Sequence, residues 1–118
     1  MPQNLLPALS WGGPGVEDAT VAGATNEIAL PTLRGEPVGS PPAAESARFV
    51  HVSIEQNGGA GGAIVKPGYT GDAMTDADGF HVGDYQPGLI LNVTGYTHLI
   101  HRGSGAGGTL HIVPLANQ

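Results

Sequence analysis

Apolar and polar residues alternate along much of the chain after residue 48, which is the pattern of half-buried β-strands. In RFVHVSIE (48–55), Val50, Val52 and Ile54 fall on one face of the expected strand, because neighbouring side chains of a strand point to opposite faces. Glycine-rich or Pro-Gly turns separate the further strands that we expect in AIVKPGY (63–69), around residues 80–82, and in LILNV (89–93), YTHLIHR (96–102) and TLHIVPL (109–115). Roughly six or seven short strands without a sustained helical period predict an all-β sandwich or barrel with almost no helix.

The first 47 residues have a different texture. They hold seven of the ten prolines and show little periodicity, and proline is poorly tolerated inside helices and central strands. TNEIALPTL (25–33) could form one strand, at a sheet edge because of Pro31. We therefore expect an extended, proline-rich N-terminal arm at residues 1–47. Residues 48–118 are expected to form a compact antiparallel β-sandwich of jelly-roll type.

Large apolar side chains in the expected arm need a partner surface, because an extended segment cannot bury them by itself. Ordering such a segment costs about 1–2 kcal/mol per residue of backbone entropy, which calls for a large contact area. Aromatic residues are enriched among the anchors of protein interfaces. The partner surface could be the chain's own sandwich or a neighbouring subunit. We favour the neighbour and expect the following residues to make subunit contacts: Leu5, Leu6, Leu9 and Trp11.

The net charge is −6, and the only fixed cations are Arg34, Arg48, Lys66 and Arg102. Nucleic-acid binding requires cations that replace counterions on phosphates, and anionic membranes attract basic segments. We therefore expect neither nucleic acid nor a membrane as a partner. The chain has no cysteine, which excludes disulfide bonds and thiolate chemistry.

Three histidines lie near the C-terminus, where a metal site could be sought. His98 and His101 are three residues apart and therefore point to opposite sides of one strand. His111 alternates with Leu110 and Ile112, so it faces away from the apolar side. Because a zinc site needs three or four converging ligands, we expect no metal here and assign these histidines to the surface or to subunit contacts.

The segment DAMTDADG contains Asp72, Asp76 and Asp78 before Gly79. An EF-hand loop would place a glutamate six residues after its glycine, and Tyr85 stands there instead. An acidic turn is the simpler interpretation, since Asp and Gly are turn formers. A weak calcium site in this loop stays open as an alternative.

Sequence motifs of catalysis are absent. No serine has a G-x-S-x-G context, and GSGAGG lacks the Gly-Lys-Ser/Thr ending of a phosphate-binding loop. We therefore expect a protein that is not an enzyme, with no catalytic residues and no cofactor.

The two final strands carry a resemblance to a known family. It rests on a penultimate strand that leads through a Gly/Ser turn to a final one, with Val93, Gly95, Tyr96, Thr97, His98 and Leu99 followed by Gly108, Thr109, Leu110, Ile112 and Leu115. Between residues 48 and 115 the chain thereby resembles small virion structural proteins of tailed bacteriophages.

The resemblance implies a capsid decoration (cement) protein on the exterior of the virion. Such a protein would bind the major capsid protein, would be a homo-oligomer with a trimer favoured, and would have no catalytic residues. Two alternatives stay open: a tail or fibre domain that binds a host glycan or receptor, and a head–tail connector. An exposed cluster of Tyr69, Tyr85 and Trp11 would favour glycan binding.

Overall fold

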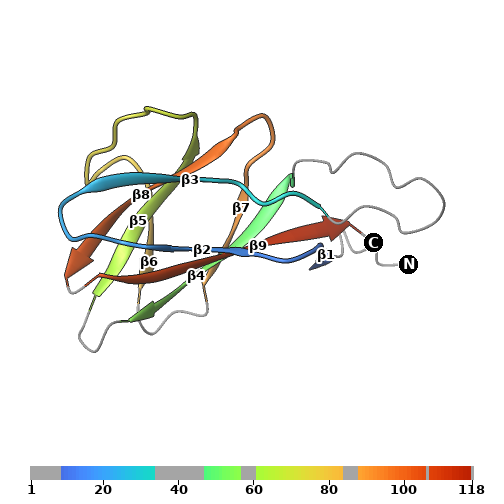
Figure 1. Cartoon of the computed structure of the whole chain (residues 1–118), viewed down its shortest axis with the longest axis horizontal. Coiled ribbons are helices and arrows are strands. Elements are labelled where there is room, and N and C mark those ends of the chain that lie inside the picture. Colours follow the sequence, from blue (N-terminus) through green and yellow to red (C-terminus); the bar gives the residue numbers. More distant parts are fainter. Residues whose placement is uncertain (1–8, 34–46, 57–60, 84–87, 106, 118) are drawn as a thin grey trace, which may run out of the picture.

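The computed structural model describes residues 9–33, 47–56, 61–83, 88–105 and 107–117, and these form nine β-strands and no helix (Figure 1). The strands are β1 (Leu9–Trp11), β2 (Val16–Ala19), β3 (Thr25–Ala29), β4 (Phe49–Gln56), β5 (Gly61–Gly68), β6 (Phe80–Gly83), β7 (Leu89–Asn92), β8 (His98–Gly105) and β9 (Gly108–Asn117).

The strands form two antiparallel sheets. The five-stranded sheet has the order β1-β9-β4-β7, and β2 also pairs with β9. The four-stranded sheet has the order β3-β8-β5-β6. This confirms the prediction of an all-β protein built from two antiparallel sheets.

The strand pairs are nested along the chain. β2 pairs with β9, β3 with β8, β4 with β7 and β5 with β6. Two further pairings, of β4 with β9 and of β5 with β8, complete the sheets. The first half of the chain thus pairs with the second half like the two arms of one long hairpin, whose tip lies between β5 and β6. The two further pairings fold this hairpin into two sheets (Figure 1).

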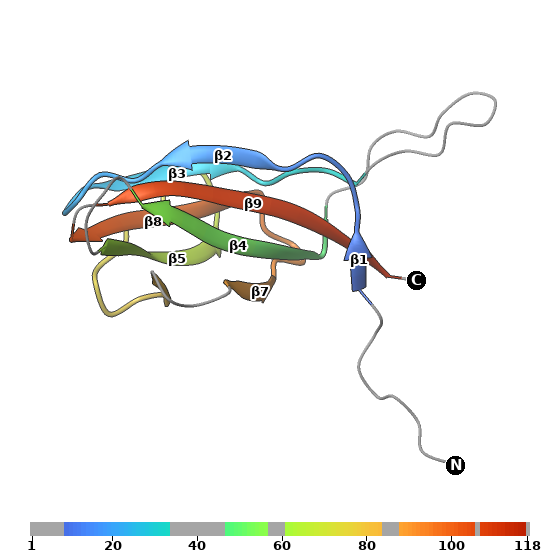
Figure 2. The ribbon, with the colours of Figure 1, turned by 90° about the horizontal axis from the view of Figure 1, so that it is seen from below.

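Residues 9–33, which we expected within an extended arm, contribute strands to both sheets. β1 and β2 pair with β9, and β3 pairs with β8. Figure 2 shows β2 running beside β9 and β3 running beside β8. The arm is therefore not confirmed for residues 9–33. The edge strand expected at 25–33 is present as β3. The rest of the expected arm, residues 1–8 and 34–46, lies outside the described residues.

A bulge between β1 and β2 accommodates a proline in the long strand β9. β1 ends opposite Leu115 and β2 begins opposite Ile112, so the outer chain advances five residues while β9 advances three. The Gly12 amide donates to the Pro114 carbonyl oxygen at 2.8 Å. Because N–H and C=O of one residue point to the same neighbour in an antiparallel ladder, the missing N–H of Pro114 falls on the bulged side and costs no bond to β4.

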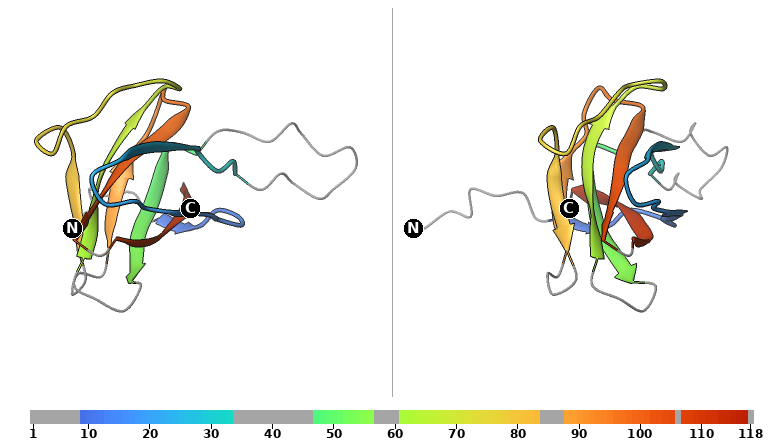
Figure 3. Two further views of the ribbon diagram at one scale, coloured as in Figure 1. Left: turned by 60° about the vertical axis from the view of Figure 1, so that its left-hand side comes forward. Right: turned by 90° about the vertical axis from the view of Figure 1, so that its left-hand side faces the viewer.

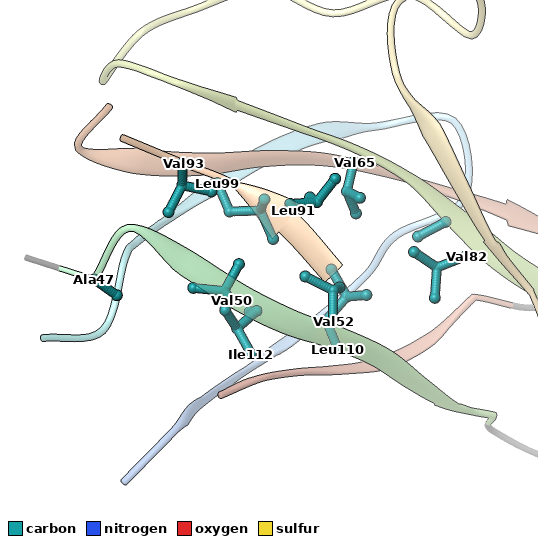
Figure 4. Packing of buried hydrophobic residues seen from close by; sticks show 11 residues of the cluster. Ala47, Val50, Val52, Val65, Val82, Leu91, Val93, Leu99, Leu110 and Ile112 are labelled. Carbon is teal, nitrogen blue, oxygen red and sulfur yellow. The ribbon is translucent and has the colours of Figure 1, made fainter. Parts of the chain in front are cut away.

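The main core lies between the inner faces of the two sheets. Figure 4 shows its side chains converging from β4, β7, β8 and β9. The alternation seen in the sequence places them there, since every second residue of these strands points inward. The buried members are Ala47, Val50, Val52, Ala63, Val65, Val82, Leu91, Val93, Leu99, Leu110 and Ile112.

A second, smaller core covers the outer face of the four-stranded sheet. The connection from β5 to β6 arches away from the end of β5 and returns to β6 (Figure 3). Met74 from this connection packs on Ile64 and Ile100, and all three side chains are buried. The four-stranded sheet is therefore covered on both faces.

Candidate functional site

His101 is fully buried, so our assignment of this residue to the surface is wrong. It alternates with Ile100, which faces outward, and so lies on the inner side of β8. His98 points to the opposite side, as the strand parity predicted, and contacts Glu27 with Nε2 to Oε2 at 3.4 Å. The prediction of divergent histidines is confirmed, although one of the two divergent directions is the protein interior.

The buried imidazole of His101 pairs with a carboxylate from the other sheet. His101 Nε2 lies 2.7 Å from Asp18 Oδ2. Asp18 is opposite Leu110 in the ladder of β2 and β9, so it shares the inner face with that core residue. This contact joins the edge strand β2 of one sheet to β8 of the other, which is a structural role.

His101 Nδ1 is buried without a hydrogen-bond partner among the described residues. A neutral imidazole that donates its Nε2 proton to Asp18 leaves Nδ1 as an acceptor, whereas an imidazolium would bury an unpaired N–H. An unmet acceptor costs less than an unmet charged donor. Asp18 is therefore the one hydrogen-bond partner of this ring among the residues that the structure describes.

His111 lies on the outer side of β9, as its position in the sequence predicted. Its Nδ1 is 3.1 Å from Glu17 Oε1 and its Nε2 is 3.1 Å from Glu55 Oε2. Both carboxylates are largely exposed. The three side chains therefore form an acidic cluster on one outer face, with one ring nitrogen directed at each carboxylate.

Glu27 fastens the β5–β6 connection to the edge strand β3. The Thr70 hydroxyl donates to Oε2 at 2.6 Å and the Gly71 amide donates to Oε1 at 2.7 Å. These hydrogen bonds, the one from Thr70 foremost, lower the pKa of Glu27 below its ordinary value of 4.5. The carboxylate serves the fold of the connection.

The three aspartates of the expected acidic turn each have a separate partner. The Tyr69 amide donates to Asp72 Oδ2 at 2.9 Å, and Arg102 Nε donates to Asp76 Oδ1 at 2.7 Å. The Thr75 amide donates to Asp78 Oδ2 at 2.7 Å and lowers the pKa of that carboxyl.

Two of these contacts are closed by a return bond, from the Asp72 amide to the Tyr69 carbonyl oxygen and from the Asp78 amide to the Thr75 carbonyl oxygen. The aspartates thus bracket two tight turns, which is the simpler of the two interpretations that the sequence left open. In the described ranges, no group of three or more His, Cys, Asp or Glu residues could hold a metal ion.

Two of the aromatic residues pair at one end of the sandwich. The rings of Tyr69 and Tyr96 have centroids 5.4 Å apart, and the Tyr69 hydroxyl donates to the Gly95 carbonyl oxygen at 3.0 Å. Both rings are exposed. Tyr85, the third tyrosine, lies outside the described residues.

Of the four expected contact residues, Leu5 and Leu6 lie outside the described residues, Leu9 is half-buried and Trp11 is 57% exposed. Trp11 opens a row of outward side chains across the five-stranded sheet. It pairs with Leu115, which pairs with Phe49. The row behind it contains Val113, His51 and Ile90.

Two open hollows mark the surface near β3. One, of about 480 Å³, is lined by Thr25, Asn26, Glu27, Gly71, Asp72, Ala73 and Met74. The other, of about 430 Å³, is lined by Pro14, Gly15, Val16, Ala29, Leu30, Pro31, Thr32 and Leu33. Neither brings together a nucleophile, a base and an orienting group, which nucleophilic catalysis would require.

The chain matches no protein-family model, no curated protein and no solved structure. Among the described residues, no helix is long and apolar enough to span a bilayer. The strands and their pairing define the class of the protein as all-β, with two packed antiparallel sheets.

Sequence reasoning missed Asp18 and Glu27, the two carboxylates that hold the edge strands in place. Both belong to the segment that we expected to be an arm. The signal was present in VEDA (16–19), where Val16 and Asp18 alternate with exposed positions. It was hidden by Gly12, Gly13, Pro14 and Gly15 on one side and Gly23 on the other, which indicated no regular structure.

Proposed function

We propose that this chain is a non-enzymatic structural protein of a bacteriophage virion, a decoration protein bound to the exterior of the shell. The observation that supports it most is the nested pairing of β2·β9, β3·β8, β4·β7 and β5·β6. Counting β1 and β2 as one interrupted strand, this nested order of eight strands supports an arrangement of jelly-roll type. That architecture recurs in viral capsid domains, in lectins and in cupins.

One fold hosts many functions, so the choice among capsid proteins, lectins and cupins has to be argued from the side chains. Several ionisable groups of the described residues are engaged in contacts that hold the fold. Asp18 and His101 join the sheets, while Glu27, Asp72 and Asp78 fix the β5–β6 connection. This use of polar groups supports an assembly role over chemistry. The resemblance of the last two strands to virion proteins supports the capsid class.

The mechanism would be added contact area across capsomer junctions. A compact sandwich bound to the major capsid protein buries apolar surface at about 25 cal/mol per Å², and this raises the barrier to rupture of the shell. A trimer of the chain would match a threefold position between capsomers.

Binding to shells tests the proposal. Purified protein is mixed with expanded shells assembled from the major capsid protein of the same source, and the shells are sedimented. We expect saturable co-sedimentation, on the order of hundreds of copies per shell, and a higher rupture temperature of the decorated shell. Absence of binding contradicts the proposal. A dozen or fewer copies in native particles would favour the connector or tail role.

Glycan binding is the second candidate, and the exposed pair of Tyr69 and Tyr96 favours it. Aromatic faces are common platforms for apolar and polar ligands alike, and jelly rolls include lectins. A glycan array probed with the wild type and with Tyr96→Ala separates the candidates. Hits that disappear in the variant would support a lectin, while an array without hits would count against it.

A further inference from the structure

The outer face of the five-stranded sheet is divided into an apolar half and an acidic half. Residues opposite each other in the ladders share a face. One row across the sheet is Trp11, Leu115, Phe49 and Asn92, and the next is Val113, His51 and Ile90, so five of these seven residues are apolar. We call Trp11, Leu115, Phe49, Val113 and Ile90 the apolar face.

The apolar face is accessible. Trp11 is 57% exposed and Ile90 is 55% exposed, and the other three side chains are half-buried. β4 and β9, which carry three of the five residues, run side by side in the centre of the sheet (Figures 1 and 2). On the other sheet, a comparable outer position, Ile100, is covered by the β5–β6 connection and is 0% exposed.

The acidic half begins one row further along. Glu17 pairs with His111 in the ladder, and Glu55 reaches the same imidazole from β4. The five strands of this sheet contain no lysine and no arginine. The described face therefore offers exposed carboxylates beside apolar side chains, without a fixed cation on its strands.

This distribution selects the chemistry of the partner. An interface core is apolar and anchored by aromatic residues, and charges at its rim face charges of opposite sign. A second copy of this chain would bring a net charge of −6 and the same carboxylates. A copy related by symmetry would offer the acidic half no lysine or arginine from these strands, and the nearest fixed cation along the chain is the exposed Arg48, which directly precedes β4.

We propose that the apolar face docks on the protein shell, at a site where apolar side chains lie beside a lysine or an arginine that faces Glu17 and Glu55. This inference rests on the proposed decoration function and adds to it the surface and the partner's chemistry. Trp11 is the anchor, and the acidic half sets the orientation.

The test measures binding to expanded shells of the same source for the wild type, Trp11→Ala, Ile90→Ala and the control Phe80→Ala. Phe80 is 56% exposed but belongs to β6 of the other sheet. Loss of an aromatic anchor residue typically weakens binding about 30-fold, and we expect this for Trp11→Ala. Ile90→Ala should weaken binding about 5-fold, and Phe80→Ala should change it less than about 2-fold.

A second pair of variants tests the contribution of the acidic half to shell binding. Glu55 and Asp76 have similarly exposed side chains, at 74% and 77%, and they lie on the outer sides of different sheets. We expect Glu55→Gln to reduce the salt dependence of shell binding, because rim charges act mainly through electrostatic steering. Asp76→Asn should leave the salt dependence unchanged.

The outcomes separate the inference from the function on which it rests. If the wild type does not bind shells, the proposed function fails and this inference fails with it. If the wild type binds and both Trp11→Ala and Ile90→Ala bind equally well while remaining folded, only the docking surface is wrong. Sedimentation velocity adds one more outcome: self-association lost in Trp11→Ala, with shell binding kept, would assign the face to a second copy and overturn the inference.

Discussion

The outer faces of the two sheets have comparable apolar positions but different covers. On the four-stranded sheet, Ile64 and Ile100 are buried beneath Met74 of the β5–β6 connection. On the five-stranded sheet, Ile90 is 55% exposed and no described residue buries it. The difference shows that the alternation of apolar and polar residues does not by itself decide whether an outward apolar side chain is buried or exposed.

The cover of the four-stranded sheet is held by polar contacts at several points. Glu27 binds the start of the connection, and Asp76 binds Arg102 further along. On the five-stranded sheet, the carboxylates of the acidic cluster bind a histidine of the same sheet. One set of carboxylates thus holds a segment over its face, whereas the other set holds no described segment over the five-stranded sheet.

The largest expected effect compares the same substitution on both faces. Ile100→Ala should lower the free energy of unfolding by about 2–5 kcal/mol, because it removes packed volume beneath the connection. Ile90→Ala should lower it by less than about 1 kcal/mol, since the side chain is half exposed. Urea denaturation of the two variants and the wild type measures both changes. Equal losses would mean that the two outer faces are covered to the same degree.

A second test compares neighbours on β2 that point to opposite faces. Asp18→Ala removes the partner of His101 and leaves a buried polar ring unsatisfied, which should lower the free energy of unfolding by about 1–3 kcal/mol. Glu17→Ala removes an exposed contact to His111 and should cost about 0.5 kcal/mol or less. Thermal unfolding of the two variants checks the order, and a larger loss in Glu17→Ala would refute the inner role of the Asp18–His101 pair.

The smallest expected effect is a pH dependence of the cover. The pKa of Glu27 is lowered in the folded protein, so its contacts to Thr70 and Gly71 stabilise the connection above its ordinary pKa of 4.5. This contribution should disappear as the pH falls below 4.5 and through the lowered pKa. The exchange rate of the Gly71 amide proton, corrected for intrinsic exchange, should rise over that range.

Glu27→Gln is the matched control for the pH experiment. Its amide side chain does not titrate, so the corrected exchange rate of Gly71 should not change with pH over the same range. A pH dependence that persists in the variant would assign the effect to another group, with Asp78 as the first to examine because its pKa is also lowered.

Several strands were predictable because their patterns are local. RFVHVSIE predicted β4, with Val50 and Val52 buried as the alternation required. The segment 25–33 was expected as an edge strand on account of Pro31, and β3 ends before that proline. In these cases the side-chain period and the turn residues sufficed.

The strands β1 and β2 were not predictable, for a physical reason. LSW and VEDA are short, and the glycines and proline between them indicate a turn. They become strands because β9 presents ten residues of free edge, and the bulge opposite Pro114 absorbs the mismatch. The partner strand, almost a hundred residues away along the chain, supplies the hydrogen bonds that the local sequence cannot specify.

The sequence by itself determined the all-β class, the divergence of His98 and His101 and the outward position of His111, and it favoured turns in the acidic segment, because strand parity and turn propensity are local properties. Only the tertiary structure decided that His101 points into the protein interior and pairs there with Asp18. It also decided that Ile100 is covered while Ile90 and Trp11 are exposed. Burial depends on what packs against a face, and here those partners are far apart along the chain.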